Sequence, residues 1–253
     1  GLTFLAVSGD GDSASIGIGQ FIHAVRRNLD MVYVLENNGV YGLTKGQYSA
    51  TAVKGSKKKK GPANEHQPID LCKLAINLGC TFVARSFSGS KKQLTALMKA
   101  AMSHKGFALI DVISPCVTFN NNDESLRSYT YVKDNDVELH AYDYIPTQTP
   151  IESAASPEGE FHDITLFDGS ILRLETIGSD HDPSDAMAAL NALHKAESED
   201  KHVTGLLYFD PTQATATEDQ CLVSTPLAEV DDEIMRPSAA TLETLNARFR
   251  GKA

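Results

Sequence analysis

The first half of the chain alternates short apolar runs with longer segments whose apolar residues recur at helical spacing. The runs that predict buried strands lie at residues 3–8, 31–35, 81–84 and 107–113. The segments that predict helices lie at about 13–28, 69–79 and 90–104, with a polar loop at about 41–67. Continuously apolar strands that alternate with helices predict an α/β fold, a doubly wound parallel sheet.

The second half has a different pattern. Residues 161–177 alternate around Asp168-Gly169, which predicts a hairpin, and a helix over 185–196 and a strand over 205–209 follow. From Pro211 the sequence becomes polar and acidic, which predicts a loose tail. We therefore expect three parts: a cofactor-binding domain over 1–122, a small α+β extension over 123–210 and a flexible tail over 211–253.

Composition places the chain among ordinary soluble proteins. Its 253 residues are 42% hydrophobic and 22% charged, and they contain no apolar run long enough for a transmembrane helix and no signal peptide. Four cysteines without a secretory signal favour reduced thiols or metal ligands in the cytoplasm. Because the sequence starts directly on a strand-like run, we expect it to be a fragment whose N-terminal segment is missing.

The charge is divided between the halves. Residues 1–133 carry 16 Lys and Arg against 9 Asp and Glu, a balance of +7, whereas the remaining residues carry 7 against 24, a balance of −17. The positive residues lack interleaved aromatic residues, so we expect no nucleic-acid partner. Bound anionic cofactors or an acidic protein partner fit the basic half as well. Lys54 and the run Lys57–Lys60 are either a solvated loop or a docking site for such a partner.

Two polar turns that follow neighbouring strands carry the candidate chemistry. Gly9-Asp10-Gly11 ends the first predicted strand, and Asn37-Asn38 ends the second. In an open α/β sheet, the carboxyl ends of the strands line the ligand crevice. Carboxylate and amide oxygens suit Mg²⁺, and glycines at a helix start let backbone N–H groups approach a phosphate. The pattern predicts a diphosphate–Mg²⁺ site; the alternative is two ordinary Asx-rich turns.

These turns and their surroundings resemble the β subunit of 2-oxoacid:ferredoxin oxidoreductases, which bind thiamine diphosphate (ThDP). The resemblance is close over residues 1 to about 122. Its motifs are Gly9-Asp-Gly-Asp-Ser-Ala-Ser-Ile-Gly, Asn37-Asn-Gly-Val-Tyr-Gly-Leu-Thr-Lys-Gly-Gln, Thr81-Phe-Val-Ala-Arg-Ser and Ile113-Ser-Pro-Cys-Val-Thr-Phe-Asn.

The resemblance implies roles for individual residues. Asp10 and Asn38 would bind Mg²⁺ through their side chains, and Val40 through its carbonyl oxygen. Leu43, Thr44 and Lys45 would face the thiazolium ring and the substrate. The full set of cofactor-binding residues implied in this way is Gly9, Asp10, Gly11, Asp12, Asn38, Val40, Tyr41, Gly42 and Leu43.

Cys116, which follows Pro115, would be one of four thiolate ligands of a [4Fe–4S] cluster. The sequence contains no Cys-x-x-Cys pair, so the other ligands would lie outside this chain. Cys72 and Cys80 occupy positions typical of buried, inert thiols, and Cys221 falls in the tail.

The activity that the resemblance implies is oxidative decarboxylation of a 2-oxoacid. Coenzyme A would take the acyl group and ferredoxin the electrons, and an α subunit would complete the active site. Lys45 and the long tail favour 2-oxoglutarate, with pyruvate or broad 2-oxoacid use as alternatives. A non-oxidative ThDP decarboxylase and a non-catalytic nucleotide-binding subunit are the other functions that remain open.

Overall fold

The computed structural model describes residues 2–56, 62–121, 125–145, 161–165, 171–176, 181–223 and 225–250. The chain forms two compact units, Gly1–Thr217 and Glu218–Ala253. The Lys57–Lys60 run and the expected turn at Asp168-Gly169 lie outside the described residues.

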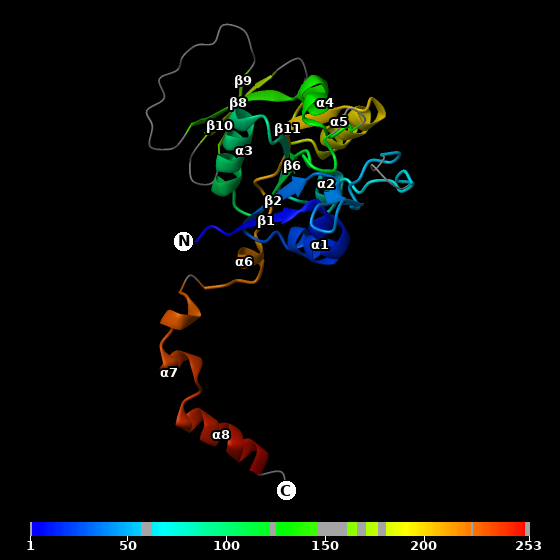
Figure 1. Ribbon diagram of the computed structural model, residues 1–253. Helices are drawn as coiled ribbons and strands as arrows, with labels where there is room; N and C mark the ends of the chain where they lie inside the picture. Colours follow the sequence, from blue (N-terminus) through cyan, green and yellow to red (C-terminus); the bar gives the residue numbers. More distant parts are fainter. Residues whose placement is uncertain are drawn as a thin grey trace. The chain divides into compact units, whose positions relative to one another are not determined.

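A six-stranded sheet forms the centre of the first unit (Figure 1). Its strands, in spatial order, are β1 (Leu5–Gly9), β2 (Met31–Asn37), β6 (Phe107–Ile113), β5 (Phe82–Phe87), β11 (His202–Phe209) and β7 (Asp136–Glu138). The first four are parallel to one another, whereas β11 pairs antiparallel with β5 and parallel with β7. The predicted α/β class is confirmed; the sheet is mostly rather than wholly parallel.

Helices cover both faces of this sheet. On one face, α1 (Ile18–Arg26), α2 (Leu71–Asn77) and α5 (Ala186–Ser198) pack in a core with Leu35 and Leu109. On the other, α3 (Lys91–Ser103) packs against Val34 and Ile110. Because successive strand residues point to opposite faces, the largely apolar strands β2 and β6 supply both cores. The helices begin and end near the predicted positions.

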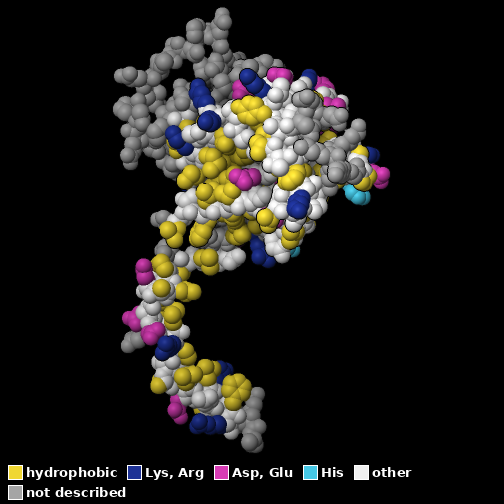
Figure 2. Space-filling model, in the orientation of Figure 1, with side chains coloured by type: hydrophobic (Ala, Val, Ile, Leu, Met, Phe, Trp, Pro, Cys, Tyr) yellow, Lys and Arg dark blue, Asp and Glu magenta, His cyan; other side chains and the backbone are white. Residues whose placement is uncertain are grey.

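Strand β1 differs from the expectation of a buried strand. It is the end strand of the described sheet, and Leu5 and Val7 remain 50% and 58% exposed. Hydrophobic side chains are visible on the side of the unit where this strand lies (Figure 2). An apolar run predicts a strand, but it does not predict whether another strand pairs with each of its two edges.

Smaller elements surround the sheet. The strands β8 (His140–Ile145), β10 (Ile171–Thr176) and β9 (Phe161–Thr165) form an antiparallel sheet, which includes the predicted pairing of the 161–177 region. The remaining elements of the first unit are the π-helix η1 (Asp12–Ile16), β3 (Val40–Tyr41), β4 (Gln47–Tyr48) and α4 (Tyr129–Asn135). The short helix α6 (Ala216–Asp219) contains the boundary between the units, which follows Thr217.

The proposed division at residue 122 stays a prediction of where the cofactor-binding part ends. The structure adds that β11 and α5, which come after this point, complete the main sheet and one of its two cores. The proposed start of a tail at 211 also stays a prediction. Within the second unit, η2 (Leu227–Glu229), α7 (Asp232–Met235) and α8 (Ala239–Arg250) are helical, and α8 has no buried residue. In the part of the chain that the structure describes, no helix combines the length and hydropathy needed to cross a bilayer.

Two histidines, the buried His104 and the half-buried His202, should make the protein less stable in mild acid. Burial lowers the pKa of His104 and of His202 to about 4. An unfolded histidine titrates near 6.5, so the unfolded chain binds more protons between about pH 6.5 and 4, and stability falls as the pH falls through this window. The Tm should therefore drop between about pH 7.5 and 5.

Asp136 has the opposite effect on the pH dependence of stability. Burial raises its pKa to about 6, so the folded chain binds a proton more tightly than the unfolded chain does. The variant His202→Gln isolates one histidine, since its amide can still donate to the Leu126 carbonyl that His202 Nε2 contacts at 2.9 Å. The Tm of His202→Gln should depend less on pH than that of the unchanged protein. Equal pH dependence of the two would contradict the assignment.

Candidate functional site

The carboxylate of Asp10, directly after β1, is almost completely buried. Its Oδ2 atom accepts hydrogen bonds from the Ser49 hydroxyl, from Thr51 Oγ1 at 2.5 Å and from the Gly39 backbone N–H at 3.1 Å. Its Oδ1 atom accepts one longer bond, 3.3 Å from the Asn38 N–H. One carboxylate oxygen is therefore saturated, and the other keeps acceptor capacity.

The turn after β2 faces this carboxylate. Gly39 adopts φ +77°, a left-handed conformation that glycine accommodates without steric cost, and this conformation turns its N–H toward Asp10. The Asn38 side-chain oxygen accepts a bond of 3.0 Å from the Val40 N–H. The Asn38 backbone oxygen accepts one of 2.7 Å from Asn120. The structure thus brings together the two predicted turns.

The helix start after Asp10 is closely packed. Gly11 is buried, and a Cβ placed on it would lie 2.3 Å from the ring of Tyr41. The Tyr41 hydroxyl donates to the Gly11 carbonyl at 3.2 Å. Asp12 is exposed and begins η1, which closes with a 2.6 Å bond from the Gly17 N–H to the Asp12 carbonyl. A π-helical turn at this position is typical of a functional site.

These residues fit a magnesium–diphosphate group in the chemistry of their donors. Asp10 Oδ1 and Asn38 Oδ1 are hard oxygen atoms, and Val40 in the same turn offers a carbonyl oxygen, which is the ligand type that Mg²⁺ takes. The buried Asp10 carboxylate is held by neutral donors, namely two hydroxyl groups and two backbone N–H groups. A divalent ion bound to Oδ1 would therefore also compensate its charge.

The expected substrate-facing residues lie on a short hairpin between β3 and β4. Leu43, Thr44 and Lys45 are exposed in its turn, and Gly42 precedes them. Lys45 itself has φ +74°. The Thr44 hydroxyl donates to Gln47 Oε1, whereas Leu43 and Lys45 are exposed in the turn. The predicted roles of the three residues stay predictions.

The turn that carries Cys116 is attached to the same region. Cys116 is half-buried, and its backbone pairs with that of Asn120 in an isolated antiparallel β-bridge. The Asn120 side chain donates a hydrogen bond to the Asn38 carbonyl oxygen. Cys72 and Cys80 are both buried as expected. Burial raises the pKa of Cys72 well above its usual value and that of Cys80 to about 12, so both are protonated core thiols. Among the three cysteines of the first unit, Cys116 lies in the turn that is bonded to the Asn38 carbonyl through Asn120.

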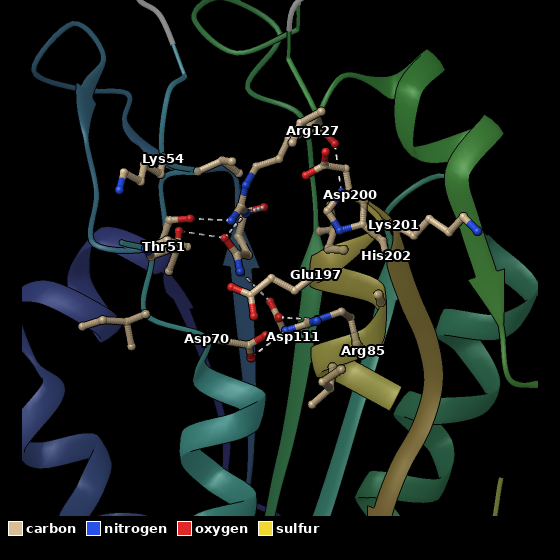
Figure 3. Close-up of a pocket in the computed structure, with 18 of the residues that line it drawn as sticks. Thr51, Lys54, Asp70, Arg85, Asp111, Arg127, Glu197, Asp200, Lys201 and His202 are labelled. Carbon is tan, nitrogen blue, oxygen red and sulfur yellow. Dashed lines mark hydrogen bonds and ion pairs between the residues drawn. The ribbon is translucent and has the colours of Figure 1, made fainter. Parts of the chain in front are cut away.

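A buried polar network behind the Asn37-Asn38 turn was missed from the sequence (Figure 3). Arg85 Nε donates to Asp111 at 2.8 Å and Arg85 Nη2 to Asp70 at 2.8 Å, so these two acids raise the pKa of Arg85 although burial alone would lower it. Asp111 also accepts from Asn37 Nδ2 at 2.9 Å. A charged residue within each of two apolar strands, Arg85 in β5 and Asp111 in β6, is the sequence signal that could have indicated this pair.

The network lines a cavity of about 260 Å³ between the sheet and α5. Asp70, Arg85 and Asp111 form its base, and the Glu197 side chain extends into it from α5 (Figure 3). Arg127 enters from above and reaches the Asn37 end of β2. The cavity therefore lies directly behind the turn that faces Asp10.

The residues that form the two turns lie in the part of the sequence that is similar to known proteins. Residues 2–112 match the family "Thiamine pyrophosphate enzyme, C-terminal TPP binding domain". The chain is 50% identical over 121 residues to the 2-oxoacid:ferredoxin oxidoreductase subunit beta of Sulfolobus sp, an alignment that covers 47% of this chain and 40% of that protein. It is 39% identical over 138 residues to the 2-oxoglutarate synthase subunit KorB of Methanocaldococcus jannaschii, covering 53% and 51%.

A solved structure extends the likeness beyond this half. The 2-oxoglutarate:ferredoxin oxidoreductase from Magnetococcus marinus, with 2-oxoglutarate, coenzyme A and succinyl-CoA bound, superposes with a TM-score of 0.63 and 27% identity, covering 94% of this chain and 65% of that one. The chain spans about two fifths to one half of the length of these two curated relatives. The predicted resemblance to the β subunits of this family is confirmed over about half of the chain.

The contact between Gly11 and Tyr41 gives a test of the packing at the site. Gly11→Ala should force the Tyr41 ring to move and lower the free energy of unfolding by about 1–3 kcal/mol, the usual cost of overpacking. Gly19→Ala is the matched control, because Gly19 lies within α1 and a Cβ placed on it would meet no atom within 4 Å. Denaturant unfolding measures both variants. A Gly11→Ala variant as stable as Gly19→Ala would contradict the close approach.

Proposed function

We propose that this chain acts as the β subunit of a ThDP-dependent 2-oxoacid:ferredoxin oxidoreductase. The observation that carries the proposal is the buried Asp10 carboxylate facing the Asn38 turn, within the residues that match a thiamine pyrophosphate binding domain. Sequence identity of 39–50% to oxidoreductase β subunits across this region supports it.

In this proposal the site holds Mg²⁺ and the cofactor diphosphate. Asp10 and Asn38 would ligate the ion by their side chains, and Val40 by its carbonyl oxygen. Gly9, Gly11 and Asp12 would lie against the diphosphate at the start of the first helix, where backbone N–H groups favour an anion. The tight contact of Gly11 with Tyr41 supports a need for glycine at this position.

The bound cofactor supplies the carbanion chemistry of 2-oxoacid decarboxylation. The part of this chain is to position that group and to bind the substrate. Lys45, exposed on the hairpin next to Leu43 and Thr44, would attract the substrate carboxylate. We propose 2-oxoglutarate as the substrate, because a second carboxylate gives this lysine a specific partner and because the Magnetococcus marinus relative is described with 2-oxoglutarate bound.

The proposed complex also contains groups that this chain does not complete. An α subunit would close the active site, coenzyme A would accept the acyl group, and ferredoxin would accept electrons. Cys116 would contribute one ligand to a [4Fe–4S] cluster beside the Asn38 turn, and the other three would come from outside these 253 residues. The attachment of the Cys116 turn to Asn38 through Asn120 supports this arrangement.

Asp10→Asn should strongly weaken cofactor binding. In the complex with the α subunit, calorimetric titration with ThDP in the presence of Mg²⁺ should give saturable binding for the unchanged chain and at least about 100-fold weaker binding for the variant, since a neutral amide cannot compensate the metal charge. Asp134→Asn, an exposed residue of α4, controls for the loss of one charge. Absence of ThDP binding by the unchanged complex would refute the proposed function.

Lys45→Met should discriminate between substrates. If Lys45 meets the second carboxylate of 2-oxoglutarate, kcat/KM for that substrate should fall about 10–100-fold, the range expected for one charge-assisted hydrogen bond. The value for pyruvate should fall less. Lys133→Met, an exposed lysine in α4, is the control. An equal loss for both substrates would argue against 2-oxoglutarate as the specific substrate.

A further inference from the structure

Arg127 is a buried cation whose role is not explained by the cofactor-binding motifs. It lies beyond residues 2–112, in the turn before α4, and only 8% of the residue is exposed. Burial lowers its pKa, an effect that the nearby Asp10 and Asp111 oppose. A buried guanidinium is costly to keep unless its contacts are needed, so the groups that it contacts indicate its use.

The guanidinium group of Arg127 joins two segments that both hold Asp10. Its Nη1 atom donates to the Asn37 carbonyl oxygen at 3.2 Å and to the Asn37 side-chain oxygen. Its Nη2 atom donates to the Thr51 carbonyl oxygen at 2.6 Å. Asn37 immediately precedes Asn38, and the Thr51 hydroxyl bonds Asp10, so the arginine ties the metal-facing turn to the segment that fixes the carboxylate.

These contacts close a ring of bonds that includes Asp10, one of the candidate metal ligands. From Asp10 the ring runs through the Gly39 N–H into the turn, back along the chain to Asn37, through Arg127 to Thr51, and returns to Asp10. Thr51 Oγ1 also lies 2.9 Å from Asn37 Oδ1, so its hydroxyl proton can be donated either to Asp10 or across the ring to Asn37. Of these ring members, Arg127 alone comes from outside the two predicted turns and the loop at 41–67.

The Arg127 side chain is not tightly packed on all sides, so close packing alone does not explain why it lies beside the Asn38 turn. Arg127 lines both the 260 Å³ cavity and a second cavity of about 200 Å³ that Gly39 and Val40 also line. Its Nε atom has no hydrogen-bond partner among the described residues. A Cβ placed on Gly39 would lie 3.4 Å from this atom, so the side chain passes directly beside the turn. The contacts to Asn37 and Thr51 therefore dominate its surroundings.

We propose that Arg127 is a positioning residue that sets the separation between the Asp10 carboxylate and the Asn38 turn, and thereby the affinity for the magnesium–diphosphate group. This inference rests on the proposed function. The planar guanidinium uses two separate nitrogen atoms for the two carbonyl oxygens, whereas a lysine ammonium carries all its donors on one atom and lacks this fixed fork. Residues that orient metal ligands typically change metal affinity about 10–100-fold when they are removed.

The test compares Arg127→Met and Arg127→Lys with Arg85→Met in the complex with the α subunit. Arg85 is the matched control, because it is a buried arginine of the same cavity that bonds Asp70 and Asp111 and reaches the turn only indirectly, through the bond between Asp111 and Asn37. The readouts are the Mn²⁺ dissociation constant by electron paramagnetic resonance, with ThDP present, and the Tm. Neither readout depends on turnover.

We expect Arg127→Met to weaken Mn²⁺ binding about 10-fold or more, Arg127→Lys to weaken it less, and Arg85→Met to lower the Tm while changing Mn²⁺ affinity no more than about 2-fold. Unchanged Mn²⁺ affinity in both Arg127 variants would overturn the inference, as would an equal loss in Arg85→Met. If Arg127→Met does not yield a folded complex, Arg127→Lys decides by the same criterion. Failure of the unchanged complex to bind Mn²⁺ and ThDP would instead refute the proposed function.

Discussion

The burial of a single carboxylate, that of Asp10, is the constraint around which this site is organised. A carboxylate removed from water needs hydrogen bonds and positive charge to remain ionised. Ser49, Thr51 and Gly39 supply the hydrogen bonds to one of its oxygens. These three donors come from the loop after β4 and from the turn after β2, so satisfying Asp10 also fixes the relative position of both segments.

The same constraint explains why ordinary-looking positions admit few residues. Gly39 must take a left-handed conformation for its N–H to face Asp10, and Gly11 must lack a side chain because Tyr41 occupies the space beside it. The parallel pairing of β1 with β2 brings the ends of both strands to one edge of the sheet. Strand register and turn conformation together therefore set the positions of the oxygen atoms of Asp10 and Asn38.

The sequence predicted the parts of this arrangement that depend on local pattern. Apolar runs identified β2 and β6, and the polar turns that follow β1 and β2 identified Asp10 and Asn38. It did not predict that β1 would be the end strand of the described sheet or that β11 would join this sheet, because strand pairing depends on residues far apart in the chain. Arg127 was missed for the same reason: an arginine in Ser125-Leu-Arg-Ser128 carries no motif, and only the folded chain brings it to Asn37 and Thr51.

The pairing of β11 with β5 has a consequence for the synthesis of the chain. Gly205 pairs with Arg85, 120 residues earlier in the sequence (205 − 85). At about 5–20 residues per second, a ribosome needs about 6–24 s to make the intervening segment. During that time the outer edge of β5 has no strand from this chain to pair with, and an unpaired edge is a template for aggregation. A chaperone or partner that binds the nascent chain during this period would cover the unpaired edge of β5.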